Sequence, residues 1–86
     1  MIQVTYTPKF IRAYKKLVPG LQAEVKQAIE FFTDKANHDR LRVHKLFGRM
    51  GDRYSFSVNY KTRVVFRFLP DDRALLLVVG DHSIYH

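Results

Sequence analysis

Four histidines are the side chains of this sequence best suited to moving a proton near neutral pH, because an unperturbed imidazole titrates there. His82 directly follows an apolar segment and stands beside Gly80 and Asp81, with Tyr85 three residues further on. A strand end in a rigid sheet can position a general acid or base well, so His82 is the first candidate. His44 is the second, because it lies among cations just before an alternating segment.

The other two histidines carry less chemical information. His38 lies in a polar segment and is expected to be exposed to solvent, and His86 is the last residue. His82 and His86 have the four-residue spacing of two ligands on a helix, but so short a segment after a strand does not form a stable helix. With no third ligand fixed by spacing and no cysteine in the chain, we expect neither a metal nor another cofactor.

The positive charge of the chain is concentrated in one segment. The 86 residues include 15 Lys and Arg against 8 Asp and Glu, a net charge of +7, and residues 35–67 hold nine of the cations but only two acidic residues. Such segregation favours a binding face for a polyanion, either nucleic acid or an acidic protein, over a surface that only confers solubility. The nine cations are Lys35, Arg40, Arg42, Lys45, Arg49, Arg53, Lys61, Arg63 and Arg67.

Histidine, arginine and tyrosine on a basic surface are the groups needed to cleave RNA without a metal. A base removes the proton of the ribose 2′-hydroxyl, a guanidinium stabilises the charge on phosphorus, and an acid protonates the leaving oxygen. Tyrosine can stack on an exposed base. No glycine-rich phosphate loop, paired-carboxylate motif or nucleophile elbow accompanies them.

These side chains must be positioned by a small α+β domain spanning residues 1–86. Alternation predicts a first strand over 2–6, and Thr7 and Pro8 are typical of a helix start. We expect a turn at residues 19–20 and a second helix from Leu21, the two helices forming an antiparallel hairpin. The second helix should bury Leu21, Val25, Ala28, Ile29 and Phe32. Residues 36–42 are expected to be a loop, anchored to the core by Leu41, Val43, Leu46 and Phe47.

Three further strands should follow as an antiparallel meander. Alternation predicts strands over 54–60 and 62–68, joined by a tight turn at 59–62, and an apolar strand over 74–79 after a turn at 70–72. The first strand should return to this sheet, and the helices should cover one of its faces. The other, half-open face should show Ser55, Ser57, Arg63 and Arg67.

The longest apolar run, 74–79, is far shorter than the ~20 residues that a membrane span needs. We therefore expect no membrane partner. We also expect a cytoplasmic protein that is monomeric when free.

Over nearly its whole length the sequence resembles the RelE/ParE superfamily of bacterial type II toxins. The resemblance depends on the order of elements and on three segments: His44-Lys45-Leu46-Phe47-Gly48 leading into Tyr54-Ser55-Phe56-Ser57-Val58, then Arg63-Val64-Val65-Phe66, and finally Val79-Gly80-Asp81-His82-Ser83-Ile84-Tyr85. It implies ribosome-dependent mRNA cleavage in the RelE-like branch or gyrase poisoning in the ParE-like branch, together with a cognate antitoxin.

The resemblance also implies residue roles. Arg63 matches the arginine that binds the scissile phosphate in RelE-like members, and His82 matches an arginine or histidine after the last strand. Tyr85 is similar to a terminal aromatic that stacks or assists catalysis, and His44 to a basic residue that some nucleases carry. Where RelE-like members have lysines, this chain has Ser55 and Ser57.

Without those lysines, either His44 or His82 acts as the general base, or nuclease activity is weak or absent. Our primary hypothesis is an mRNA endoribonuclease toxin in which His82, Arg63, Tyr85 and His44 are catalytic. Its alternatives are a gyrase inhibitor and a non-enzymatic basic binding module. The expected partners are an acidic antitoxin, mRNA and the ribosome, and the residues expected to hold RNA are Lys45, Arg49, Arg53, Lys61 and Arg67.

Overall fold

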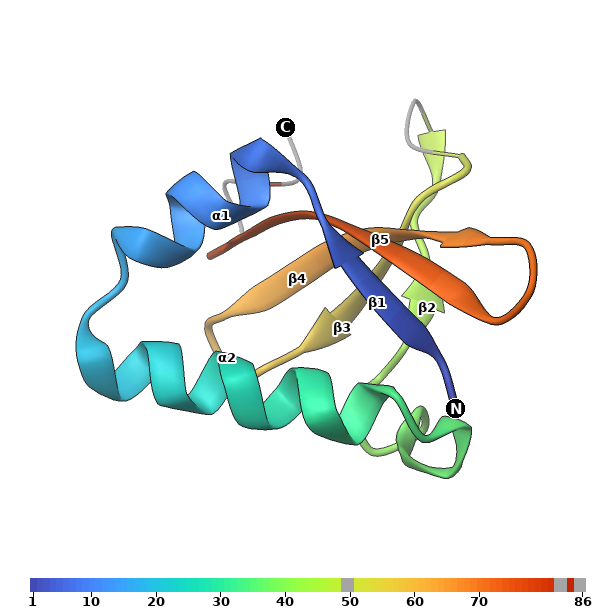
Figure 1. The fold of residues 1–86 in the computed structure, drawn as a ribbon, viewed down its shortest axis with the longest axis horizontal. Helices are drawn as coiled ribbons and strands as arrows, with labels where there is room; N and C mark the ends of the chain where they lie inside the picture. Colours follow the sequence, from blue (N-terminus) through green and yellow to red (C-terminus); the bar gives the residue numbers. More distant parts are fainter. Residues whose placement is uncertain (49–50, 82–83, 85–86) are drawn as a thin grey trace.

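The computed structural model describes residues 1–48, 51–81 and 84, and it has the α+β architecture that the sequence predicts (Figure 1). The five strands form one sheet in the order β1-β5-β4-β3-β2, with β1 parallel to β5 and the other neighbours antiparallel. The elements are β1 (Gln3–Tyr6), α1 (Pro8–Lys15), α2 (Pro19–Phe32), the 3-10 turn η1 (Lys35–Asn37), β2 (His44–Lys45), β3 (Tyr54–Ser57), β4 (Arg63–Leu69) and β5 (Arg73–Gly80). The short edge strand β2 was not expected from the sequence.

Thr7 caps α1, as predicted, and also attaches the helix to the sheet. Its Oγ1 accepts a hydrogen bond from the backbone N–H of Phe10 at 3.0 Å and lies 3.1 and 3.0 Å from the carbonyl oxygens of Leu76 and Leu77. Pro8 occupies the first helical position, where its missing N–H costs nothing. The start of α1 is therefore fixed against β5.

Leu77 is the extra residue of a β-bulge in β5. Val65 of β4 pairs with Val78, whereas its neighbour Phe66 pairs with Leu76. Because side chains alternate along a strand, the inserted residue shifts the alternation by one position. Val79 consequently lies in the same buried cluster as Leu76.

The expected turn at residues 19–20 is wrong, because Pro19 and Gly20 are the first residues of α2. Proline fits the first turn of a helix as well as it fits a tight turn. The sequence alone is therefore compatible with a turn at these residues and with a helix that begins there. The two helices are linked by Gln22, whose Nε2 donates to the carbonyl oxygen of Tyr14 at 3.0 Å.

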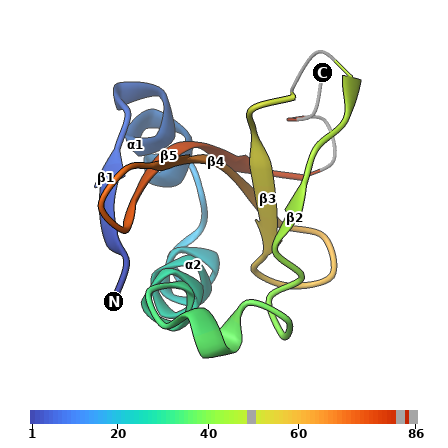
Figure 2. The ribbon, with the colours of Figure 1, turned by 90° about the vertical axis from the view of Figure 1, so that its right-hand side faces the viewer.

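The helix α2 lies on the concave side of the twisted sheet, between β1 at one edge and β2 and β3 at the other (Figure 2). Phe32 is the centre of the core and is fully buried. Its ring centroid lies 4.7 Å from that of Phe56, 4.8 Å from that of Phe66 and 4.9 Å from that of His38. Residues 25, 28, 29 and 32 are buried as predicted, while residue 21 is only half-buried.

The prediction that His38 is exposed is wrong. The ring is half-buried and stacks on Phe32, and its Nε2 lies 2.9 Å from the carbonyl oxygen of Phe32. Because a carbonyl can only accept, Nε2 carries the proton. His38 therefore closes the end of the core and is a structural histidine.

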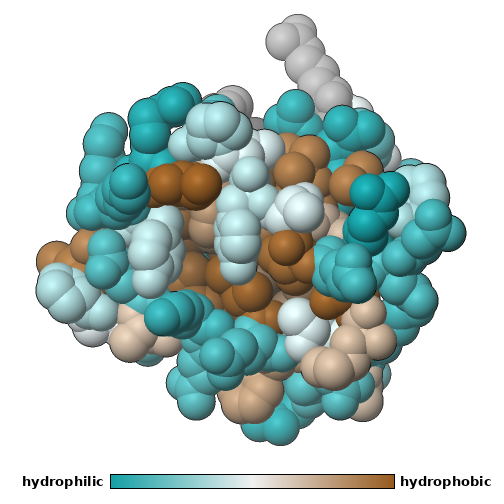
Figure 3. All heavy atoms as spheres, in the orientation of Figure 1, coloured by the Kyte–Doolittle hydropathy of each residue, from teal (hydrophilic) through white to brown (hydrophobic). Residues whose placement is uncertain are grey.

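The loop before β2 is anchored by fewer residues than expected. Leu41 is buried and Val43 packs against the core, but the side chain of Phe47 is 89% exposed. Phe47 therefore does not anchor the loop. Apolar atoms also reach the surface between α1, α2 and β1 (Figure 3), where Tyr6, Phe10 and Ile29 contribute to a cavity of about 220 Å³.

The turn between β4 and β5 lies at residues 70–72, as predicted. Asp71 and Asp72 have φ angles of 63° and 55°, in the left-handed region that carboxamide and carboxylate residues tolerate best after glycine. Lys35 donates a hydrogen bond to Asp72 at 2.8 Å and lowers the pKa of that carboxyl group. In the part of the chain that the structure describes, no helix has the length and apolar character needed to span a membrane.

Candidate functional site

The face of the sheet turned away from α2, here called the outer face, brings several of the predicted residues together. Paired residues of neighbouring strands lie on the same face of a sheet. The pairs His44–Ser55 and Ser57–Arg63 therefore lie on one face, opposite the core residues Phe56 and Val64. The outer face includes His44, Ser55, Ser57, Arg63, Val65, Arg67, Leu75, Val78 and Gly80.

Arg63 is half-buried and held by the turn between β3 and β4. Its Nη1 donates to the carbonyl oxygens of Asn59 and Thr62, the latter at 3.2 Å. The guanidinium has three further N–H donors, on Nε and Nη2, since arginine carries five in a planar fork. Arg63 is therefore anchored at one edge of the fork and can still bind a phosphate with the rest.

Asn59 organises this turn, and sequence reasoning missed its role. Its Oδ1 accepts hydrogen bonds from the backbone N–H groups of Lys61 and Thr62, each at 2.9 Å. Its Nδ2 donates to Glu24 of α2 at 3.3 Å, which attaches the turn to the helix. An asparagine at the first position of a turn is the sequence signal that could have identified it.

His44 lies exposed on the edge strand β2 with a defined tautomer. Its Nδ1 lies 2.7 Å from the carbonyl oxygen of Arg42, a residue with a left-handed φ of 55°. The carbonyl can only accept, so Nδ1 carries the proton and Nε2 of the neutral ring keeps a free lone pair. That nitrogen can accept a proton from a substrate hydroxyl.

His44 and Arg63 share the outer face but do not touch. They belong to strands on either side of β3. His44 pairs with Ser55 of β3 and Arg63 pairs with Ser57, two positions further along that strand. Strand spacing and rise together put their Cα atoms about 12 Å apart. A group bound between them must therefore bridge two strands.

The outer face is less open than predicted. Ser55 and Val65, which pair across β3 and β4, are both fully buried. Ser57 is half-buried and lies at the open end, opposite Arg63. The centre of this face is thus closed, and its accessible residues are the half-buried Ser57 and Arg63 next to the β3–β4 turn, His44 at the β2 edge and Arg67 at the far end.

The end of β5 lies at the same end of the sheet, and so does Ile84. Gly80 pairs with Arg63, so the chain leaves the sheet beside the arginine. Ile84 then folds back over Gly80, and the N–H of Ile84 donates to the carbonyl oxygen of Asp81 at 3.1 Å. The predicted residues His82 and Tyr85, and also Arg49, lie outside the described residues.

Replacing Gly80 by alanine is expected to destabilise the protein by about 1–3 kcal/mol, the usual cost of overpacking. A Cβ at this position would stand 2.5 Å from Cγ2 of Ile84. This methyl group is attached directly to the branched Cβ of isoleucine and has little freedom to move. Urea unfolding measures the change. Gly20→Ala is the matched control, because a Cβ there meets nothing within 4 Å.

The double variant Gly80→Ala/Ile84→Ala separates this contact from a general intolerance of the strand end. Removing Cγ2 of Ile84 should recover part of the stability lost in Gly80→Ala. Equal stability of Gly80→Ala and the wild-type protein would show that Ile84 does not pack on Gly80 in solution.

The cations expected to hold RNA lie at different places. Lys61 is exposed in the β3–β4 turn next to Arg63, and Lys45 and Arg53 are exposed along the β2 edge. Arg67 lies at the far end of the outer face, and its Nε is 3.2 Å from a carboxylate oxygen of Asp52. Arg67 is thus partly neutralised, whereas the cations nearest Arg63 are not in ion pairs among the described residues.

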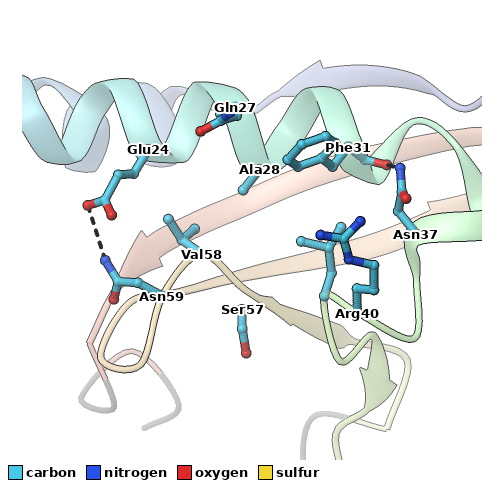
Figure 4. Close-up of a pocket in the computed structure, with 10 residues that line it drawn as sticks. Glu24, Gln27, Ala28, Phe31, Asn37, Arg40, Ser57, Val58 and Asn59 are labelled. Carbon is cyan, nitrogen blue, oxygen red and sulfur yellow. Dashed lines mark hydrogen bonds between the residues drawn. The ribbon is translucent and has the colours of Figure 1, made fainter.

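A cavity of about 330 Å³ lies between α2 and the end of β3 (Figure 4). Glu24 and Asn59 stand at one end of it and Arg40 at the other, where the guanidinium carbon is 5.9 Å from the ring centroid of Phe31. Ser57 points away from α2 and toward the outer face (Figure 4). The described residues contain no group of three histidine or carboxylate side chains arranged to hold a metal ion.

Comparison by sequence finds no relatives. No protein-family model matches the chain, and no curated protein matches it significantly.

Comparison by structure gives many matches. The RelBE2 toxin–antitoxin complex of Mycobacterium tuberculosis contains a chain 22% identical to this one, with a TM-score of 0.72 over 94% of this chain and 98% of that chain. For the archaeal RelE–RelB complex of Pyrococcus horikoshii the identity is 16% and the TM-score 0.73, over 95% and 96%. For YafQ of Escherichia coli the identity is 11% and the TM-score is 0.79, over 99% of this chain and 98% of that chain.

These structural neighbours confirm the predicted fold. They include RelE, YafQ and a YoeB/ParE toxin, and the match extends over nearly the whole of both chains. The chain therefore has the same fold as these proteins. Because the sequence identities are 22% or lower, this similarity is evidence for a shared fold.

Proposed function

We propose that this protein is the toxin of a type II toxin–antitoxin pair and that it cleaves mRNA on the ribosome. The observation that carries the proposal is the pairing on the outer face, which sets Arg63 beside the end of β5 and His44 on the same face. The structural neighbours include toxin–antitoxin complexes. The gathering of cations in residues 35–67 supports a nucleic-acid substrate.

The proposed reaction is an internal transesterification. A base removes the proton of the ribose 2′-hydroxyl, whose oxygen attacks phosphorus and forms a 2′,3′-cyclic phosphate. The bond from phosphorus to the 5′-oxygen breaks, and an acid protonates that oxygen. The guanidinium of Arg63 stabilises the additional charge on phosphorus.

Two histidines are available for the proton transfers. His44 offers an unprotonated Nε2 on the outer face, so we assign it the role of general base. His82 comes two residues after Gly80, the partner of Arg63, and we assign it the role of general acid. Tyr85 is proposed to stack on a base or to assist the acid.

The proposed partner is an acidic antitoxin. A protein with a net charge of +7 attracts an acidic segment, and such a segment can fold as it binds. Binding over the cations near Arg63 would exclude RNA, which explains how one surface serves both partners.

Expression in bacteria without an antitoxin tests the proposal. Growth should stop and cellular mRNA should be cut at internal sites, and co-expression of a small acidic protein encoded next to the gene should restore growth. His44→Ala and His82→Ala should each reduce toxicity. Full toxicity in both variants would contradict the assigned proton transfers.

Two other outcomes would contradict the nuclease itself. Growth arrest with intact mRNA and loss of DNA supercoiling would identify a gyrase inhibitor. Normal growth on expression would identify a binding module without toxic activity.

A further inference from the structure

Tyr60 has no role in holding the fold together. Its side chain is 89% exposed at the tip of the β3–β4 turn, and none of the aromatic contacts within the described parts of the chain involves it. A large aromatic side chain stabilises a fold by being buried, and Tyr60 leaves nearly all of its surface in water. The ring is therefore accessible to a partner outside the chain.

The turn that carries Tyr60 is rigid. The Oδ1 atom of Asn59 accepts hydrogen bonds from two backbone N–H groups, and the N–H of Val58 donates to the carbonyl oxygen of Thr62 at 2.9 Å. The bond from Asn59 to Glu24 ties the turn to α2. A rigid support lowers the entropy cost of placing an aromatic ring against a ligand.

The same turn fixes a phosphate-binding group. Arg63 donates to the carbonyl oxygen of Asn59, the residue just before Tyr60, and Lys61 lies exposed just after it. One element thus presents an exposed ring, a guanidinium and an ammonium group. An aromatic ring beside cations is the combination that binds single-stranded nucleic acid, with stacking on a base and ion pairing to the backbone.

We infer that the β3–β4 turn is a base-binding element, in which Tyr60 stacks on a nucleobase of single-stranded RNA next to the phosphate held by Arg63. The inference rests on the proposed function and adds a substrate contact to it. Stacking on a ring is tolerant of base identity, so Tyr60 contributes affinity and position rather than sequence preference.

The test measures binding to ribosomes programmed with a short mRNA whose 2′-hydroxyls are methylated, so that the RNA is bound without being cut. Tyr60→Ala should raise the dissociation constant about 5- to 150-fold, the range for losing one base–aromatic stack. Tyr60→Phe should bind like the wild-type protein because it keeps the ring. Phe47→Ala is the matched control, since Phe47 is equally exposed, at 89%, at the opposite end of β3.

A set of mRNAs with a single abasic nucleotide identifies the contact. At one position, loss of the base should weaken binding of the wild-type protein and remove the difference between wild type and Tyr60→Ala. Equal binding of Tyr60→Ala and wild type to the intact mRNA would overturn the inference and leave the proposed function standing. Failure of the wild-type protein to bind programmed ribosomes would overturn both.

Discussion

Arg63→Ala is expected to slow mRNA cleavage about 10²- to 10³-fold, the usual effect of removing one group that stabilises charge in a transition state. The guanidinium of Arg63 is fixed by two carbonyl oxygens of the turn and directs its other donors away from them. Arg63→Lys should recover only part of the rate, because an ammonium group cannot make the two parallel hydrogen bonds of the planar fork. Single-turnover cleavage of ribosome-bound mRNA measures both.

Arg73→Ala is the matched control for this prediction. Arg73, like Arg63, is an arginine at the start of a strand whose side chain donates to a turn carbonyl, but it is exposed and lies beside the β4–β5 turn, where its Nε donates to the carbonyl oxygen of Pro70 at 3.0 Å. Arg73→Ala should leave the cleavage rate within about twofold of the wild-type rate. This difference is small compared with the loss expected for Arg63→Ala. A similar loss of rate in both variants would mean that total positive charge, and not the position of Arg63, sustains cleavage.

Phe32→Ala is expected to lower the free energy of unfolding by about 3–5 kcal/mol. The ring is fully buried and stacks on Phe56 and His38 at the centre of the core, so no neighbour can move in to fill the cavity without disturbing another ring. A domain of this size is stable by roughly 5–15 kcal/mol, so the variant should be close to unfolding. Urea unfolding followed by circular dichroism measures the difference.

Phe31→Ala is the control on the neighbouring residue. Phe31 is also on α2, but it is 44% exposed and lines the cavity between α2 and β3, where Arg40 lies over its ring. Its loss should cost well under half as much as that of Phe32, because part of the ring is already in water. Equal losses for the two variants would contradict the assignment of Phe32 to the centre of the core.

Elements whose formation depends on local chemistry were predicted well. The cap at Thr7 and Pro8, the buried stripe of α2 and the turns at 59–62 and 70–72 each depend on residues close together in the sequence. At residues 19–20 two local rules competed, and the helix start prevailed over the turn.

Features that depend on contacts between distant residues were not predictable. The two-residue strand β2 exists only through its pairing with β3, and the bulge at Leu77 depends on the register between β4 and β5. The stacking of His38 on Phe32 requires the loop to close over the end of the core.

The candidate site shows the same division. The alternation in β3 and β4 sufficed to predict that Ser57 and Arg63 share a face. The burial of Ser55 and the anchoring of Arg63 by Asn59 depend on side-chain packing and turn geometry, which periodicity does not encode.

The most direct test of the central claim is incubation of the purified protein with a defined mRNA, with and without ribosomes. Primer extension should reveal internal cuts with 2′,3′-cyclic phosphate ends when ribosomes are present, and far fewer without them. Intact mRNA in both reactions, from a protein whose folding is confirmed by circular dichroism and which stops growth in cells, would contradict the account.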